Sequence, residues 1–305
     1  MLKGDLVEKI SNLKEEKNAV LLAHNYQSKE IQLAADYLGG SLSLARRSKE
    51  LDADLIVFAG VDFMAEMTSI LNPKKKVVMT DSDATCPLAE HLPVEKVREA
   101  KENHPTAATV LYVNTFSDAK AEADVICTSS NASEIVSKVG EEKVLFGPDR
   151  NLSSLVQRET DKDVIPIPED GYCYVHKMIF PEEIQRLKER QGYTEVIVHP
   201  ECDPEIQEVA DYVCSTGDMI PKVRESSADR FVVGTETGMV ERLRRDFPDK
   251  EFVPALRAAV CEDMKKHSLE KVVNSLEEEQ YVVEVPEDVA VEAKRAIERM
   301  LEMSE

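Results

Sequence analysis

Short, continuous apolar runs alternate with amphipathic stretches along the whole chain. In its first part, the runs expected to form strands are VLLAHN at 20–25, LIVFAG at 55–60 and VVMT at 77–80. The stretches between them that are expected to form helices are IQLAADYL at 31–38, SLSLARRSKEL at 41–51 and DFMAEMTSIL at 62–71. Continuous apolar runs indicate strands buried on both faces, and alternation with helices indicates parallel βαβ units.

Several features recur at one period. Cys86, Cys173 and Cys261 are 87 (173 − 86) and 88 (261 − 173) residues apart. The same spacing relates the glycines that end apolar runs, the acids two residues later, three Ala-Asp pairs, and the hydroxyl residues that follow those pairs. These sets are Gly60, Gly147 and Gly234; Asp62, Asp149 and Glu236; Ala35-Asp36, Ala123-Asp124 and Ala210-Asp211; and Ser41, Ser129 and Thr216. The chain therefore consists of three copies of one unit. The period of this repeat is longer than that of solenoid repeats.

The repeat predicts an α/β fold with three pseudo-symmetric α-β-α sandwich domains, whose short parallel sheets surround a central active site. We expect the units to span residues 1–87, 88–175 and 176–264, with a C-terminal helix in 265–305 that packs back on the first unit. The apolar face of that helix comprises Val289, Ala293, Ala296, Ile297, Met300 and Leu301. No Pro/Gly/Ser-rich linker separates the units, so they should be tightly docked.

Composition narrows the class of protein. No apolar run approaches the ~20 residues that span a bilayer, and the charged N-terminal segment does not resemble a signal peptide. The formal net charge of −21 disfavours binding to nucleic acid or to anionic membranes. We therefore expect a cytoplasmic protein without nucleic-acid or membrane partners, and any anionic substrate must find local donors at its site.

Polar residues end the predicted strands. They are His24, Asn25 and Tyr26 in the first unit, Tyr112 and Asn114 in the second, and His199 and Glu201 in the third. Ligands of parallel α/β units bind beyond the carboxyl ends of the strands. If the units close around a pseudo-threefold axis, these side chains, the repeated hydroxyls and the three cysteine loops converge on one pocket.

Three converging cysteines suggest a metal centre. Six cysteines occur without a CxxC pair, and disulfides are uncommon in a reducing compartment. A [4Fe–4S] cluster usually takes four cysteines, so three leave one iron open to act as a Lewis acid. Zinc held by three cysteines and a histidine, and three buried structural cysteines, are the alternatives. We expect Cys127 and Cys214 to pack in the core and Cys202 to line the pocket without binding metal.

The histidines divide into two groups. His91, His104 and His267 have polar sequence neighbours and are expected at the surface. His24 and His199 end strands at the expected site, and His176 follows Cys173 by three residues. We expect the second group to contact ligand or to support the metal centre.

The motifs along the chain resemble those of one family, the quinolinate synthases. The matching segments are LLAHNYQ at 21–27, GVDFMAE at 60–66, DATCP at 83–87, LYVN at 111–114, ADVICTSSNA at 123–132, FGPDRNL at 146–152, VIVHPEC at 196–202, STG at 215–217, GTETGM at 234–239 and AVCEDMKK at 259–266. The resemblance implies three α/β domains in a triangle, with a [4Fe–4S] cluster held by Cys86, Cys173 and Cys261. It implies condensation of iminoaspartate with dihydroxyacetone phosphate to quinolinate, phosphate and water, a transferase reaction of NAD biosynthesis. The upstream partner would be L-aspartate oxidase or aspartate dehydrogenase.

The resemblance also implies roles for individual residues. Tyr26 and Glu201 match the acid/base positions, with Glu201 also in contact with substrate. The positions expected to bind carboxylate or phosphate oxygens are His24, Ser41, Ser129, His199, Ser215 and Thr216. Tyr112 and Asn114 match substrate contacts, and Met64 and His176 match pocket or cluster-shell positions. The sequence departs from the family at Gly40, where an aspartate is common.

Two other functions are compatible with three converging cysteines. A different three-cysteine [4Fe–4S] hydro-lyase would share the open iron, but the triplicated period argues against it. A non-enzymatic iron–sulfur or zinc sensor would have no need of the polar residues at the strand ends, and no basic DNA-reading helix is visible. A Rossmann dehydrogenase is disfavoured because no GxGxxG follows the first strand.

Overall fold

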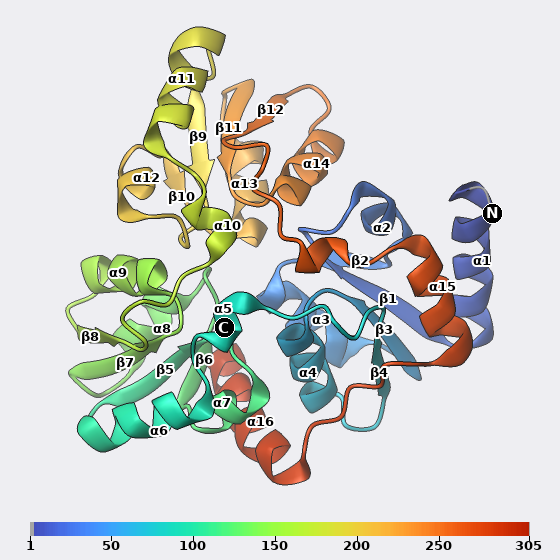
Figure 1. The fold of residues 1–305 in the computed structure, drawn as a ribbon, viewed down its shortest axis with the longest axis horizontal. Coiled ribbons are helices and arrows are strands. Elements are labelled where there is room, and N and C mark those ends of the chain that lie inside the picture. Colours follow the sequence, from blue (N-terminus) through green and yellow to red (C-terminus); the bar gives the residue numbers. More distant parts are fainter. Residues whose placement is uncertain (1–2, 305) are drawn as a thin grey trace.

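The computed structural model describes residues 3–304, in which three four-stranded sheets form the centres of three units (Figure 1). The strands are β1 (Ala19–His24), β2 (Tyr37–Gly39), β3 (Leu55–Ala59) and β4 (Lys76–Met79); β5 (Ala108–Tyr112), β6 (Val125–Cys127), β7 (Lys143–Gly147) and β8 (Asp163–Pro166); and β9 (Glu195–Val198), β10 (Tyr212–Val213), β11 (Arg230–Gly234) and β12 (Glu251–Pro254). All pairings within the sheets are parallel, and each sheet has the order second, first, third, fourth strand. The predicted fold class is therefore confirmed.

Helices cover the sheets in each unit. They are α1 (Lys3–Glu16), α2 (Lys29–Ala34), α3 (Ser41–Glu50), α4 (Asp62–Leu71) and α5 (Pro87–Glu90); α6 (Val94–Asn103), α7 (Ser117–Ala121), α8 (Ala132–Lys138), α9 (Arg150–Glu159) and α10 (Tyr174–Lys177); α11 (Pro181–Gln191), α12 (Pro204–Glu208), α13 (Thr216–Glu225) and α14 (Thr237–Asp246); the 3-10 helix η1 (Asp263–Lys265); and α15 (Leu269–Glu278) and α16 (Glu287–Met303). In the part of the chain that the structure describes, none of these helices combines the length and apolarity that a membrane span requires.

The repeated Ala-Asp pairs fix the edge strand of each sheet. The carboxylates of Asp36, Asp124 and Asp211 accept the N–H of Leu21, Thr109 and Val196, respectively, each at 2.8 Å. The N–H of each aspartate in turn donates to the carbonyl of the same partner at 2.9–3.0 Å. These bonds hold the chain extended from the aspartate onward. The helix expected over 31–38 therefore ends at Ala34, and residues 37–39 form β2.

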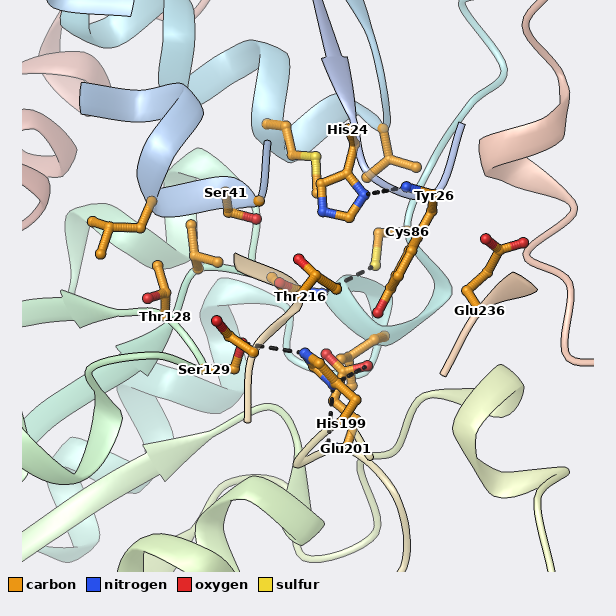
Figure 2. A pocket seen from close by; sticks show the side chains of 18 of the residues that line it. His24, Tyr26, Ser41, Cys86, Thr128, Ser129, His199, Glu201, Thr216 and Glu236 are labelled. Atoms are coloured by element: carbon orange, nitrogen blue, oxygen red, sulfur yellow. Dashed lines mark hydrogen bonds and ion pairs between the residues drawn. The ribbon is translucent and has the colours of Figure 1, made fainter. Parts of the chain in front are cut away.

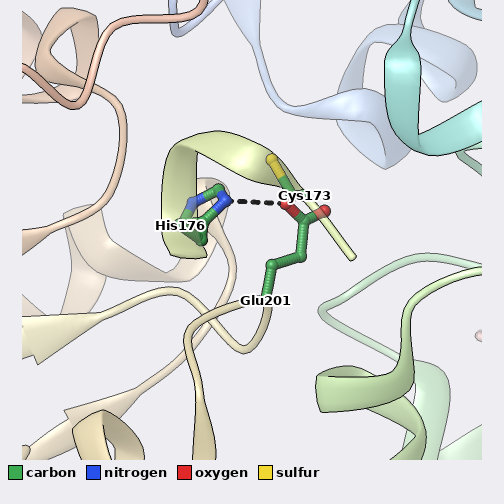
Figure 3. A group of neighbouring side chains, drawn as sticks. All are labelled: Cys173, His176 and Glu201. Carbon is green, nitrogen blue, oxygen red and sulfur yellow. Dashed lines mark ion pairs between the residues drawn. The ribbon is translucent and has the colours of Figure 1, made fainter. Parts of the chain in front are cut away.

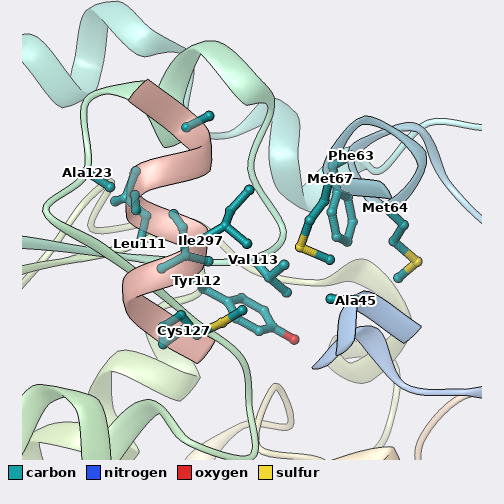
Figure 4. Close-up of a cluster of buried hydrophobic side chains, with 14 of the residues drawn as sticks. Ala45, Phe63, Met64, Met67, Leu111, Tyr112, Val113, Ala123, Cys127 and Ile297 are labelled. Carbon is teal, nitrogen blue, oxygen red and sulfur yellow. The ribbon is translucent and has the colours of Figure 1, made fainter. Parts of the chain in front are cut away.

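The first two units share one hydrophobic core, and α16 lies within it. Figure 4 shows Ile297 of α16 beside Leu111 and Val113 of the second unit, with Phe63 and Met67 of the first unit nearby. Burial of a large aliphatic side chain such as Ile297 contributes about 1.5–3 kcal/mol.

The C-terminal segment differs from expectation. The single helix predicted in 265–305 is two helices. Of these, α15 packs against α1 and β3 in the first unit, whereas α16 packs mainly against α7 and β6 of the second unit and also contacts α4 of the first. Glu279, in the left-handed region at φ 50°, ends α15 and directs the chain away from it. The apolar face of α16 thus joins two units.

The third unit has separate apolar clusters on the two faces of its sheet. Its link to the first unit includes polar contacts: Asn25 donates to Thr216 Oγ1 at 3.0 Å, and Arg242 donates to the Leu38 carbonyl at 3.0 Å. Gly40 lies at the same junction, where an added Cβ would be 2.9 Å from Thr216 Oγ1. A glycine at this position lets the two units approach closely.

Candidate functional site

A cavity of about 500 Å³ lies where the carboxyl ends of the three sheets meet (Figure 2). Of the residues that the sequence singled out for the site, Asn25 is not part of the lining, because its amide is turned to Thr216. The others line the cavity: His24, Tyr26, Ser41, Met64, Cys86, Tyr112, Asn114, Ser129, Cys173, His176, His199, Glu201, Ser215, Thr216 and Cys261. All three units contribute, because equivalent strand ends of a triplicated fold point to one centre.

His24 and His199 stand in equivalent turns of the first and third units. The N–H of Tyr26 donates to His24 Nδ1 at 3.2 Å, and the N–H of Glu201 donates to His199 Nδ1 at 3.3 Å. A backbone N–H can only donate, so Nδ1 is the acceptor and the neutral ring carries its proton on Nε2. His199 Nε2 lies 3.2 Å from Ser129 Oγ (Figure 2). Both rings are thus set to donate a hydrogen bond from Nε2.

Burial keeps these rings uncharged. It lowers the pKa of His24 and of His199 from 6.5 to about 3. His267 is also buried, and burial lowers its pKa to about 4. The prediction of a surface position for His267 was wrong, because its ring is buried, with Nδ1 bonded to Thr80 Oγ1.

These shifts predict that the chain without bound metal loses stability as the pH falls below 6.5. The unfolded chain binds protons at the three histidines there, whereas the folded chain does not until near pH 3–4. Each buried histidine should contribute up to about 1.4 kcal/mol per pH unit to the slope. Urea unfolding between about pH 7 and pH 5 should give a shallower slope for His24→Gln and an unchanged slope for the half-exposed control His104→Gln. Equal slopes in all three proteins would contradict the assignment.

A chain of polar contacts connects Tyr26 to Tyr112 across the cavity. The Tyr26 hydroxyl and Thr235 Oγ1 are 2.6 Å apart, and Thr235 Oγ1 is 2.8 Å from His176 Nε2. His176 Nδ1 lies 2.8 Å from Glu201 Oε2. The Tyr112 hydroxyl donates to Glu201 Oε1 at 2.7 Å. The two residues predicted for acid/base work, Tyr26 and Glu201, therefore belong to one network.

The environment separates the protonation states of Tyr26 and Glu201. Burial, and then the charge of Glu201, raise the pKa of Tyr26, so its phenol keeps its proton. Burial alone would raise the pKa of Glu201, but His199, His176 and the Tyr112 hydroxyl outweigh that effect and lower it. Groups whose pKa values are pushed apart in this way suit opposite roles, one as acid and one as base.

The three repeated cysteines also line the cavity, each half-buried and free of disulfide bonds. Burial raises the pKa of all three thiols, and neighbouring groups that include Cys261 raise those of Cys86 and Cys173 further. A bound cation would reverse that preference, because it stabilises thiolates. Asn114 Nδ2 lies 4.0 Å from Cys86 Sγ.

One compact group of metal-ligating atoms includes a cysteine. Within residues 3–304, Cys173, His176 and Glu201 place ligand atoms within 4.8 Å of one another (Figure 3). The three cysteine sulfurs do not form such a compact group among these residues.

The remaining cysteines have other surroundings. Cys127 is buried in β6 as expected. Cys214, just beyond β10, is half-buried and packs against the apolar cluster on one face of the third sheet. Cys202 is buried with its Sγ 3.3 Å from the Gly234 carbonyl and does not line the cavity, so the expected lining position was wrong.

The repeated hydroxyls stand at or near the starts of helices. Ser41 and Thr216 are the first residues of α3 and α13. Ser215 caps α13, since its Oγ accepts the N–H of Asp218 at 3.2 Å and donates to the Asp218 carboxylate at 2.6 Å. The first N–H groups of a helix carry partial positive charge and bind anions.

Sequence reasoning missed Thr235 and left Glu236 without a role in the site. Thr235 joins Tyr26 to His176, but the equivalent positions in the other units are Val61 and Pro148, so the repeat gave no signal. Glu236 was visible as a repeated acid and also lines the cavity.

Comparisons with known proteins agree on one family. The family model described as "Quinolinate synthetase A protein" matches residues 8–302. Three curated relatives are each named quinolinate synthase. That of Methanothermobacter thermautotrophicus is 52% identical over 303 residues, 99% of each chain. That of Pyrococcus horikoshii is 51% identical over 98% of this chain and 99% of its own, and that of Thermotoga maritima is 49% identical over the same shares.

Proposed function

The chain belongs to the quinolinate synthase family of enzymes, and from this premise we propose that it condenses iminoaspartate with dihydroxyacetone phosphate to quinolinate, phosphate and water in NAD biosynthesis. The observation that carries the proposal is the single cavity in which three thiols, one from each unit, face the network of Tyr26 and Glu201. Iminoaspartate would be supplied by L-aspartate oxidase or aspartate dehydrogenase, and we place the reaction in the cytoplasm.

We propose that Cys86, Cys173 and Cys261 hold a [4Fe–4S] cluster. A single zinc ion holds sulfur ligands at about 2.3 Å, which places tetrahedral neighbours about 3.8 Å apart. The three sulfurs do not form one of the compact groups that could hold a single ion among the described residues, which favours a larger centre. Such a cluster with three cysteine ligands supplies an iron open to substrate, able to polarise a hydroxyl or carboxylate oxygen.

The side chains would bind the anionic groups of the substrates. His24 and His199 offer Nε2–H donors, which suit carboxylate oxygens. The first turns of α3 and α13, with Ser41 and Thr216, offer N–H groups and hydroxyls for phosphate or carboxylate. These local donors offset the repulsion of anions by a chain of net charge −21.

Proton transfer would run through the network. Glu201 is the base, because its carboxylate lines the cavity, with one oxygen accepting the Tyr112 hydroxyl and the other 2.8 Å from His176 Nδ1. Tyr26 is the acid, and Thr235 and His176 connect its hydroxyl to Glu201. A proton taken up at Glu201 can thus return through Tyr26 without entering bulk water.

A second metal centre has one observation in its favour. Cys173, His176 and Glu201 together could hold a single zinc ion, with one sulfur, one nitrogen and one oxygen ligand. That arrangement leaves Cys86 and Cys261 without a role, although they line the same cavity. Metal analysis of the same preparation separates the two centres.

Mössbauer spectroscopy of the iron-57 protein, prepared without oxygen, tests the proposal. We expect a [4Fe–4S] signal in which about one iron in four changes its environment when quinolinate is added. A cluster that does not respond to quinolinate would move the assignment to another hydro-lyase. Bound zinc, or no metal at all, would remove the proposed chemistry and leave only the fold.

A further inference from the structure

The repeated acids connect the site to its cysteine loops. Each acid stands at the start of the helix that follows the third strand of its unit, and a backbone bond joins that helix start to the carbonyl two residues before the cysteine. These bonds are Asp62 N to Ala84 O at 3.0 Å, Arg150 N to Gly171 O at 2.9 Å and Thr237 N to Ala259 O at 3.1 Å. All three cysteine loops are therefore attached to a helix N-terminus in the same way.

In the third unit the side chain of the acid reinforces this attachment. Glu236 is fully buried, and its Oε2 accepts the N–H of Gly238 in α14 at 2.6 Å. Its Oε1 accepts the N–H of Cys261 at 3.3 Å and lies 2.9 Å from Lys265 Nζ. One carboxylate thus bridges the helix and the cysteine loop, with a different oxygen for each.

Lys265 extends the contact to the first unit. Its ammonium group also donates to the backbone carbonyl of Tyr26, and Figure 2 shows Glu236 at the Tyr26 end of the site. The carboxylate of Glu236 therefore fixes a cation that in turn fixes Tyr26. The third cysteine and the phenol are held from one buried point.

We propose that Glu236 is a positioning residue that holds Cys261 in place to bind the cluster, an inference that rests on the proposed function. A carboxylate is required because donors approach both of its oxygens. The glutamine amide has only one acceptor. Whichever way it is turned, its NH₂ group faces an N–H donor, either that of Gly238 or those of Cys261 and Lys265.

Asp62 offers a matched comparison in the first unit. Its Oδ1 accepts the N–H of Phe63, and its Oδ2 accepts the Thr85 hydroxyl at 2.5 Å. A hydroxyl can rotate and accept instead of donating, so an asparagine at this position can keep both contacts. A backbone N–H and an ammonium group cannot reverse in this way.

The test compares Glu236→Gln with Asp62→Asn, which make the same change of charge at equivalent positions. Each protein is loaded with iron and sulfide without oxygen, and release of iron to an excess of chelator is followed by absorbance. We expect release about tenfold or more faster from Glu236→Gln, because a buried donor loses its acceptor, and within about twofold of the native chain from Asp62→Asn. Glu236→Asp keeps both acceptor oxygens on a side chain one methylene shorter and should fall between the native chain and Glu236→Gln.

The outcomes separate this inference from the proposed function. Native protein that binds no iron would overturn the proposed cluster and the inference with it. Native protein that holds a cluster, with equal release from the native chain and Glu236→Gln, would overturn the role of Glu236 alone. Thermal unfolding of the iron-free variants checks folding. If Glu236→Gln does not fold, unchanged release from Glu236→Asp overturns the role, and faster release supports it.

Discussion

Replacement of Glu201 with glutamine is expected to lower kcat by about 10²- to 10⁴-fold, the usual contribution of a positioned acid or base. The amide keeps the size of the side chain but cannot accept a proton. Its carbonyl can still accept the Tyr112 hydroxyl, and its NH₂ group can donate to His176 Nδ1, so the contacts of the side chain are kept. The loss should therefore appear in kcat, with little change in iron content.

Steady-state kinetics and iron analysis on one preparation measure this effect. Glu205→Gln, with the same change in charge at an exposed position of α12, is the matched control and should behave as the native chain. Thr235→Val adds a second comparison, because it interrupts the path from Tyr26 to His176 but leaves Glu201 in place. Native kcat in Glu201→Gln, with the cluster intact, would refute Glu201 as the base.

The architecture was predictable because one period recurs through the chain. The repeated Ala-Asp pairs, glycines and acids mark the same points of each sheet, and the three sheets share one strand order. Polar residues at the carboxyl ends of the first strands identified the cavity, since parallel strands bring those ends together. His24 and His199 could therefore be located before any contact was known.

What the sequence did not predict depends on contacts between distant residues. Asp36 ends the helix α2 early because it bonds to Leu21, a partner fifteen residues back that no local propensity indicates. The apolar face of α16 predicted burial, but the first unit was expected to cover it, whereas α16 packs mainly against α7 and β6 of the second. Thr235 joined the site through Tyr26, more than two hundred residues away in the sequence.

Serine in place of any one of the three cavity cysteines is expected to remove the cluster, which is the largest effect that the repeat predicts. Each unit supplies one thiol, so no cysteine of the cavity lining duplicates another. A serine hydroxyl keeps its proton near neutral pH and is a harder ligand than the thiolate that iron–sulfur clusters require. A cluster held by two thiolates should be lost.

Iron analysis of Cys86→Ser, Cys173→Ser and Cys261→Ser, each prepared without oxygen, measures the loss. We expect iron to fall from about four per chain to less than about a tenth of that in all three variants. Cys214→Ser is the matched control, because Cys214 is half-buried like the three ligands but lies outside the lining of the cavity. It should keep its iron.

Because Cys173 also belongs to the compact group with His176 and Glu201, a loss confined to Cys173→Ser would instead indicate a single ion at that group. Equal loss in all three variants is the result that only a centre shared by the three units explains.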